Sequence, residues 1–378
     1  MFFKFITPVS AMFIFFTMVY SQQTDLITKA IEKIEIPQSP ESFNPLFHFP
    51  PVNQDTTSAC WSFATASFFE SEAKRLGFEP VKLAVMFPVY YGFIEKAKAF
   101  VKTKGKSRFA PGDLFTTVVE VVNKYGIVPE QNYRGQTRAC STYNHRSLYS
   151  ELNQYIEKVK TDSIWDEELV LKTVTFILDK HLGKPPEQFN YDGKKYNPKT
   201  FAAEKLHLPF QDYILVTSFS YAPFYSFTTL DVPDNWQKIT DYFNVPLEVF
   251  YNSLKGAVKK GYSVVIDGDF SEPGRDGLKD ISIIPEFDIP AGAINQSARD
   301  FRFNNKSTTD DHLMHIVGYQ QLNGQDWFLV KDSWRDAFEG KYKGYFFYHG
   351  DFVKLKVLAY MVNKEGVPQI VKRVKEIN

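Results

Sequence analysis

The sequence predicts an α+β protein in which a helical half and a strand-rich half are separated by a mostly helical insertion. Apolar residues recur at helical spacing through residues 53–134, and short apolar runs bounded by turn residues dominate residues 262–363. Between them, residues 135–261 combine helical patterns with one hairpin pattern. With 378 residues, 44% of them hydrophobic, the chain can bury a sizeable core as one large domain or two closely packed domains.

Charge and composition exclude several classes of function. Lys and Arg together number 44, as do Asp and Glu, so no net charge attracts nucleic acid or an anionic membrane surface, and we expect no nucleic acid partner. The two cysteines form no Cys-x-x-Cys pair, and two histidines three positions apart on an expected strand make a poor zinc site. We therefore expect neither a metal nor another cofactor.

Residues 1–21 have the pattern of a secretory signal peptide. Lys4 precedes an apolar stretch that ends at Phe16, and short residues follow at which cleavage is expected. An uncleaved anchor is the alternative, but Pro8 and its polar neighbours shorten the apolar run below the roughly 20 residues that a spanning helix needs. We therefore expect an exported protein, periplasmic or secreted, that leaves the membrane after cleavage and begins with a Pro-rich segment, residues 22–52.

A helix that begins at Cys60 organises the helical half. A short polar loop leads into the cysteine, and a dense apolar run extends from Trp61 to Leu76 until Gly77 ends it. Unpaired N–H groups and the macrodipole at a helix N-terminus favour negative charge, so Cys60 would be held as a reactive thiolate. The alternative is a buried cysteine that only packs.

Further helices are expected on both sides of residue 135. In the helical half, periodic apolar residues predict helices over 88–102 and 113–125, which would pack on the Cys60 helix. In the insertion, Asp192-Gly193 marks the turn of a hairpin over 189–196. The other helical patterns of the insertion occupy residues 148–160, 165–182 and 246–260.

The strand-rich half carries a tight-turn signal, Asn323-Gly324, between two of its apolar runs. Short β-branched and aromatic runs on both sides of this turn predict a sheet that packs against the helices. The expected strands occupy residues 263–267, 312–320, 327–331, 344–348 and 355–362.

Two histidines on one expected strand compete for the place opposite Cys60. His312 and His315 are an odd number of positions apart, so a regular strand points them to opposite faces. If the Asn323-Gly324 turn is a plain two-residue loop, the register places Asp332 on the face of His315. A bulge or a longer loop shifts the pairing by one residue and places Asp332 on the face of His312. The local pattern therefore does not decide whether His312 or His315 shares a face with Asp332.

Three short motifs, in order along the chain, resemble those of the papain-like cysteine peptidases. They are Gln54 before Cys60-Trp61, His312 ahead of Val317-Gly318-Tyr319, and Ser333-Trp334. Within that superfamily, residues 124–130 and 308–332 look most like the bleomycin hydrolase and aminopeptidase C branch. The resemblance implies a papain-like fold, in which a helical half and an antiparallel sheet or barrel half face each other across an active-site cleft.

The resemblance also implies site residues, and it favours His312 over His315 by the motif spacing. A Cys60 thiolate would attack the scissile carbonyl, His312 would protonate the leaving amine, and Asp332 would hold the imidazole ring. The Gln54 side-chain amide and the Cys60 N–H would stabilise the oxyanion. Trp334 would lie on the substrate-binding side and shield the contact between histidine and aspartate from water.

Three positions depart from the family pattern. Asp332 stands where the family usually has Asn, Arg335 where it has Gly, and Ser58 where Gly is common. A carboxylate can orient a histidine, but its charge would also raise the pKa of the imidazolium unless Arg335 neutralises it. Ser58 would narrow the approach to the thiolate.

Only two cysteines, Cys60 and Cys140, are present. In an exported protein two cysteines suggest one disulfide, which would remove the nucleophile. The secreted papain-like enzymes usually bridge a cysteine three positions before the nucleophile, where this chain has Thr57. The resemblance to the bleomycin hydrolase branch, whose cytosolic members lack that bridge, implies that both thiols are free.

The tail, residues 364–378, is where the resemblance implies specificity. In bleomycin hydrolase-like enzymes a C-terminal arm blocks the cleft, and the carboxylate of the last residue, here Asn378, would meet the ammonium of the substrate. The alternative is a frayed basic helix on the surface. The insertion of this branch also makes contacts between subunits, and some members are hexamers, so a homo-oligomer is expected.

These observations together predict an exported cysteine aminopeptidase with a Cys60–His312–Asp332 mechanism and peptides as substrates. The first alternative is a papain-like cysteine endopeptidase. The second is a catalytically impaired family member that acts as a binding or scaffold protein, which the departures at Ser58, Asp332 and Arg335 motivate.

Overall fold

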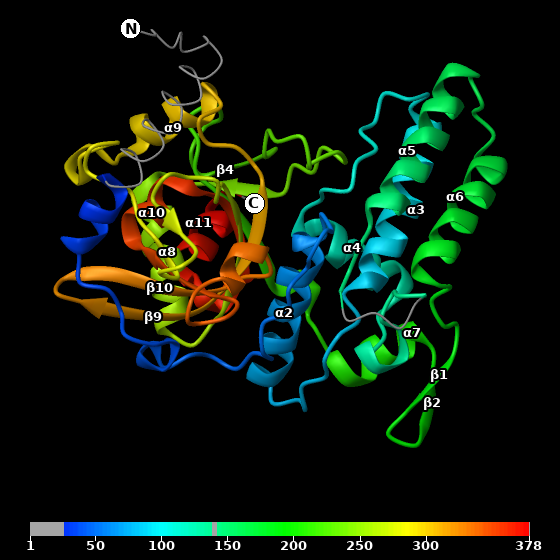
Figure 1. Cartoon of the computed structure of the whole chain (residues 1–378), viewed down its shortest axis with the longest axis horizontal. Helices are drawn as coiled ribbons and strands as arrows, with labels where there is room; N and C mark the ends of the chain where they lie inside the picture. Colours follow the sequence, from blue (N-terminus) through cyan, green and yellow to red (C-terminus); the bar gives the residue numbers. More distant parts are fainter. Residues whose placement is uncertain (1–25, 138–141, 378) are drawn as a thin grey trace, which may run out of the picture.

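The computed structural model describes residues 26–137 and 142–377. The expected signal peptide, residues 1–21, lies outside the described residues, as do Cys140 and Asn378. Within the described part of the chain, no helix has both the length and the apolar character needed to cross a membrane. In Figure 1 a group of helices lies to the right, a large sheet with its own helices lies to the left, and α2 runs between them.

The interior helix α2 (Cys60–Arg75) separates the helical layer from the sheet. It is buried along nearly its whole length, and Trp61, Phe68 and Phe69 are at most 1% exposed. A helix that is apolar on all sides has to be covered on all sides, which the two layers achieve. The helices of the outer layer agree closely with their predicted ranges: α3 (Met86–Lys102), α4 (Phe115–Tyr125), α5 (Arg146–Thr161) and α6 (Glu167–Leu182).

The segment predicted as a mostly helical insertion also supplies strands. The expected hairpin forms between β1 (Phe189–Tyr191) and β2 (Lys194–Tyr196), with positive φ at Asp192 and Gly193. After it, however, three short strands join the large sheet, so this part of residues 135–261 belongs to the sheet half. The further elements of this segment are α7 (Pro198–Phe201), β3 (Tyr213–Thr217), β4 (Ser226–Thr228), β5 (Tyr242–Asn244) and α8 (Leu247–Lys259).

The large sheet has ten strands among the described residues, in the order β4-β5-β3-β12-β6-β9-β10-β11-β8-β7. Its centre is antiparallel, whereas β3 pairs with β5 and β11 with β8 in parallel. The order runs from one edge strand to another, so the described sheet is open and is not a closed barrel. The strands of the last third are β6 (Val264–Gly268), β7 (Arg275–Asp276), β8 (Ile281–Ser282), β9 (His312–Leu322), β10 (Gln325–Lys331), β11 (Tyr345–His349) and β12 (Val357–Asn363).

A bulge in β9 decides which histidine shares a face with Asp332. The turn is a plain two-residue loop, because Leu322 pairs directly with Gln325. The register then shifts: Leu329 pairs with Gly318 and Val330 pairs with Ile316, which leaves Val317 as an extra residue. Lys331 consequently lies opposite His315, and Asp332 falls on the face of His312.

The tail packs on the sheet half through its own helix, α11 (Pro368–Ile377). Ile370 is fully buried, and Gln369 Nε2 donates to Ser253 Oγ of α8 at 2.9 Å. Residues 368–377 thus form the surface helix expected as the alternative to a cleft-blocking arm, and Ile370 and Val374 pack against the core of the sheet half. The predicted role of the Asn378 carboxylate concerns a residue outside the described chain and stays a prediction.

Short helices complete the described chain. Besides α9 (Gln296–Asn304) and α10 (Gly350–Lys356), they are η1 (Pro40–Phe43), η2 (Glu130–Asn132), η3 (Ala202–Leu206), η4 (Phe210–Asp212), η5 (Ala291–Ala293), η6 (Arg335–Phe338) and η7 (Lys364–Gly366).

Candidate active site

Cys60 is the first residue of α2, as the sequence predicts, and its thiol is free. The preceding residue, Ala59, offers no side-chain cap, although its carbonyl oxygen accepts from the N–H groups of Ser62 and Phe63. The first N–H groups of a helix have no partner within the helix, and they carry the positive end of its dipole. The local backbone therefore favours a negative charge on the Cys60 sulfur or on an oxygen beside it.

His312, the first residue of β9, reaches Cys60 from the sheet. Its Nε2 lies 2.8 Å from Asp332 Oδ1, and the Cys60 side chain lies near enough to the ring to contribute to its raised pKa. Burial alone would lower the pKa of His312, but Asp332 and then Cys60 oppose it and raise the pKa to about 10. The ring is therefore an imidazolium at neutral pH, placed between a carboxylate and the sulfur.

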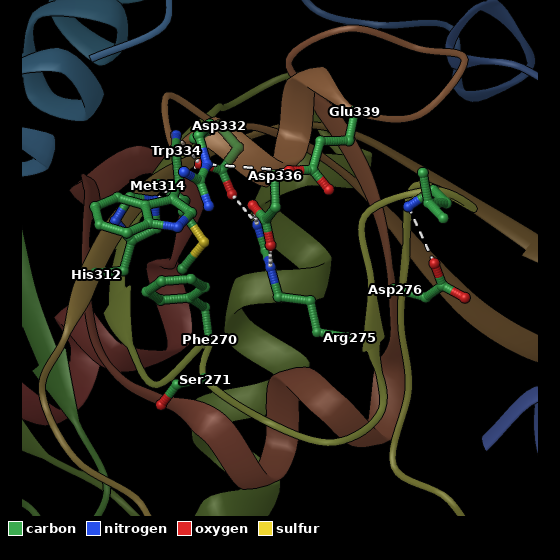
Figure 2. A network of polar contacts seen from close by, with 12 residues as sticks. Phe270, Ser271, Arg275, Asp276, His312, Met314, Asp332, Trp334, Asp336 and Glu339 are labelled. Atoms are coloured by element: carbon green, nitrogen blue, oxygen red, sulfur yellow. Dashed lines mark hydrogen bonds and ion pairs between the residues drawn. The ribbon is translucent and has the colours of Figure 1, made fainter. Parts of the chain in front are cut away.

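A buried arginine, Arg275 of β7, binds Asp332 Oδ2, the carboxylate oxygen that His312 does not contact (Figure 2). Its guanidinium donates to Asp332 Oδ2 at 2.9 Å, to both carboxylate oxygens of Asp336 at 2.8 Å, and to the Tyr348 hydroxyl at 2.8 Å. The planar fork suits this arrangement, because one guanidinium can serve several acceptors at fixed angles. The Phe346 ring centroid lies 3.6 Å from its central carbon and helps to exclude water.

Arg275 corrects the expectation for Arg335. The Arg335 side chain is 81% exposed, and its Nε lies 4.0 Å from Glu339. The charge of Asp332 is instead balanced by Arg275, whose side chain is only 4% exposed. Burial raises the pKa of Asp332, but His312 and Arg275 together hold that pKa well below its usual range. No signal in the local sequence links residue 275 to residue 332, so sequence reasoning missed it.

Aromatic rings cover the contact between His312 and Asp332 (Figure 2). Trp334 lies edge-on to the His312 ring with a centroid separation of 6.0 Å, and the Trp334 N–H donates to Asp332 Oδ1 at 2.7 Å. Phe270, which the sequence did not single out, lies 4.7 Å from the same ring. These rings reduce the access of water, so the electrostatic interactions between the charged groups are stronger than in bulk solvent.

Gln54 is fully buried beside the loop that leads to Cys60. Its Nε2 donates to the Thr57 carbonyl at 2.8 Å, and its Oε1 accepts from Ser333 Oγ at 2.7 Å. Because a carbonyl oxygen can only accept, the first contact fixes which way the amide faces. A primary amide carries two N–H groups, so one remains for an oxyanion, the role that the motif implies for Gln54.

Two further residues that the sequence analysis names are Ser58, which lies at the edge of the site, and His315, which lies behind it. Ser58 is exposed, and its N–H donates to the hydroxyl of Tyr149 from α5 at 3.3 Å. His315 is fully buried on the opposite face of β9, where its Nδ1 lies 2.9 Å from Ser67 Oγ of α2. Lys331 donates to the same hydroxyl at 2.8 Å. His315 thus belongs to the core.

The described chain contains no group of three or more His, Cys, Asp or Glu residues that could hold a metal ion.

A thiol at a helix N-terminus, an imidazolium and an orienting carboxylate define a site of the cysteine-peptidase type. The model of the Peptidase C1-like family matches residues 20–378, and the chain belongs to that family. This membership confirms the resemblance to papain-like cysteine peptidases that the three motifs indicate.

The solved structure of one bacterial protein, PepW, has the same fold. PepW from Lactobacillus rhamnosis is 17% identical over 98% of this chain and 95% of its own, with a TM-score of 0.70. A digestive procathepsin L 3 from the larval midgut of Tenebrio molitor is 15% identical over 84% of this chain and 66% of its own, with a TM-score of 0.37. No curated protein matches the chain. The structural match with PepW therefore spans nearly the whole chain, including most of the segment between residues 135 and 261.

Replacing the orienting carboxylate should move the pH profile of peptide hydrolysis. Asp332→Asn removes the charge that keeps His312 protonated, so the imidazolium should be lost at a lower pH. The alkaline limb of kcat/KM, expected near the His312 pKa of about 10, should shift to lower pH in Asp332→Asn. Asp336→Asn is the matched control, because Asp336 also pairs with Arg275 but is not bonded to His312. An alkaline limb at the same pH in the wild type and in Asp332→Asn would contradict the assignment of Asp332 as the group that keeps His312 protonated.

Removing the buried arginine should cost stability. Arg275→Gln leaves Asp336 without its cation and Asp332 with His312 alone, and breaking a buried ion pair typically costs about 3–5 kcal/mol. Urea unfolding followed by tryptophan fluorescence should show a lower midpoint with an unchanged slope. Arg335→Gln, at an exposed neighbouring site, should leave the midpoint nearly unchanged. Equal midpoints for the two variants would show that Arg275 does not stabilise the site.

Proposed function

We propose that this protein is an exported cysteine aminopeptidase that removes residues from the N-terminus of peptides. The observation that carries the proposal is the contact of Cys60 with an imidazole that Asp332 holds from behind. Membership of the Peptidase C1-like family supports the reaction class, and the resemblance to the bleomycin hydrolase and aminopeptidase C branch supports the aminopeptidase. Export rests on the signal-peptide pattern of residues 1–21.

In the proposed reaction the Cys60 sulfur attacks the scissile carbonyl carbon, and the carbonyl oxygen becomes an oxyanion. The Cys60 N–H and the free N–H of Gln54 stabilise that oxyanion. His312 transfers its proton to the leaving amine as the C–N bond breaks, which leaves a thioester on Cys60. A water molecule, deprotonated by His312, then attacks the thioester and releases the acid product. Asp332 keeps the ring oriented through both steps.

Assembly of several chains is part of the proposal. Leu169 and Phe176 lie seven residues apart on α6, so they share one face of the helix, and they are 51% and 69% exposed. Exposed apolar residues on one helix face favour contact with another protein surface. The insertion helix α6 is thus a candidate for the subunit contact that the family resemblance implies.

Two histidine variants test the proposal most sharply. His312→Ala should lower kcat/KM for a fluorogenic peptide by about 10³-fold or more, because it removes the proton donor. It should also slow alkylation of Cys60 by iodoacetamide at neutral pH. His315→Gln, altered three positions away on the opposite strand face, should keep its turnover per folded molecule.

The substrates in this test decide the reaction type. A free-amino peptide should be hydrolysed much faster than its N-acetyl counterpart. Equal hydrolysis of both would point to an endopeptidase, and a sluggish thiol without turnover would point to a binding protein. Undiminished turnover in His312→Ala would contradict the assignment of the catalytic histidine.

A further inference from the structure

A small cavity lies between α2 and the sheet, on the side of β9 that faces away from His312. Its volume is about 20 Å³, which is enough for one occupant of the size of a water molecule. The proposed mechanism uses no group on this side of β9. We call it the α2–β9 cavity, and the side chains that line it include Phe63, Ala64 and Ser67 of α2, Leu313 and His315 of β9, and Lys331 of β10.

The polar side chains of the α2–β9 cavity form one chain of hydrogen bonds. Lys331 Nζ donates to Ser67 Oγ at 2.8 Å, and Ser67 Oγ lies 2.9 Å from His315 Nδ1. The hydroxyl accepts from the lysine and has one proton of its own, which it donates to Nδ1. Burial holds the pKa of His315 well below its usual range, so the ring is neutral and carries its single proton on Nε2. This Nε2–H is buried and has no hydrogen-bond partner among the described residues.

Lys331 is a buried amine without a counterion. The residue is 8% exposed, and Ser67 is its one hydrogen-bond partner within residues 26–137 and 142–377. An ammonium has three N–H groups, so two of them have no acceptor there. Burial first, and then the charge of Lys82, lower the pKa of Lys331 to about 7. A negative charge beside Lys331 would therefore stabilise its protonated form.

The carboxylates nearest to the α2–β9 cavity do not supply that charge by direct contact. Glu70 pairs with Lys82, at 3.5 Å. Asp332 lines the cavity, but its carboxylate is bound by two cations on the other face of the sheet. Glu130 also lines the cavity, and in the described part of the chain it forms no ion pair with Lys331.

We propose that the α2–β9 cavity binds a single halide ion, with chloride as the ordinary occupant, on Lys331 and His315. The ion would accept from the two remaining N–H groups of Lys331 and from the Nε2–H of His315. A water molecule could accept the same hydrogen bonds, but it brings no charge to the buried ammonium. The cavity volume excludes larger anions, such as an organic carboxylate.

The bound ion would join the two elements that carry the catalytic pair. Ser67 lies seven residues after Cys60 on α2, so both lie on the same face of the helix. His315 lies on the same strand as His312. A halide ion between Lys331 and His315 would therefore stabilise the packing of α2 on β9. This inference goes beyond the proposed peptidase and does not depend on it.

Thermal unfolding of the full-length protein tests the site without a peptide substrate. At constant ionic strength, replacing sodium gluconate by sodium chloride should raise the unfolding midpoint of the wild type by about 2 °C or more, because the ion binds only the folded state. Lys331→Met keeps the apolar stem but removes the charge, so the two salts should give the same midpoint. Lys341→Met, at an exposed position, is the matched control and should respond to chloride as the wild type does.

Bromide gives a second measurement, which needs no variant and decides the question if Lys331→Met does not fold. Anomalous diffraction from wild-type crystals soaked in sodium bromide should place one bromide in the α2–β9 cavity, within hydrogen-bond distance of Lys331 Nζ. A water molecule there, without an anomalous signal, would overturn the inference. Equal midpoints of the wild type in the two salts, or an undiminished chloride effect in Lys331→Met, would also overturn it.

Discussion

The proposed chemistry depends on one buried carboxylate, Asp332, which lies between the His312 imidazole and the Arg275 guanidinium. A carboxylate buried without a cation would bind a proton, become neutral and no longer attract the imidazolium. Two cations prevent this: His312 binds one oxygen at 2.8 Å and Arg275 binds the other at 2.9 Å. Because Arg275 also binds Asp336, the charges form a chain: removing Asp332 leaves His312 without its carboxylate, and removing Arg275 leaves Asp336 without its cation.

The fold supplies this chain from elements that are far apart in sequence. Helix α2 brings Cys60 with the positive end of its dipole, and the bulge at Val317 turns Asp332 toward His312 rather than His315. The side of β9 that carries His315 packs on α2 through Ser67. One strand therefore anchors the interior helix with one face and presents the imidazole with the other.

The sequence predicts the long periodic elements and most of the site, because periodicity and motif spacing are local. It does not predict β3, β4 and β5, whose three to five residues are too short to show a period. It also leaves the register of Asp332 open, since a bulge depends on how a strand fits its neighbours. Arg275 stayed unnoticed because its partners come together only in the folded chain, and so the exposed Arg335 was expected to neutralise Asp332 in its place.

The central claim remains the charge state of His312. Nitrogen NMR of the ¹⁵N-histidine-labelled protein, with His312→Ala to assign the signal, measures that state directly. The account predicts a doubly protonated ring at pH 7 that loses its proton only near pH 10. A His312 ring that is already neutral at pH 7 would contradict it.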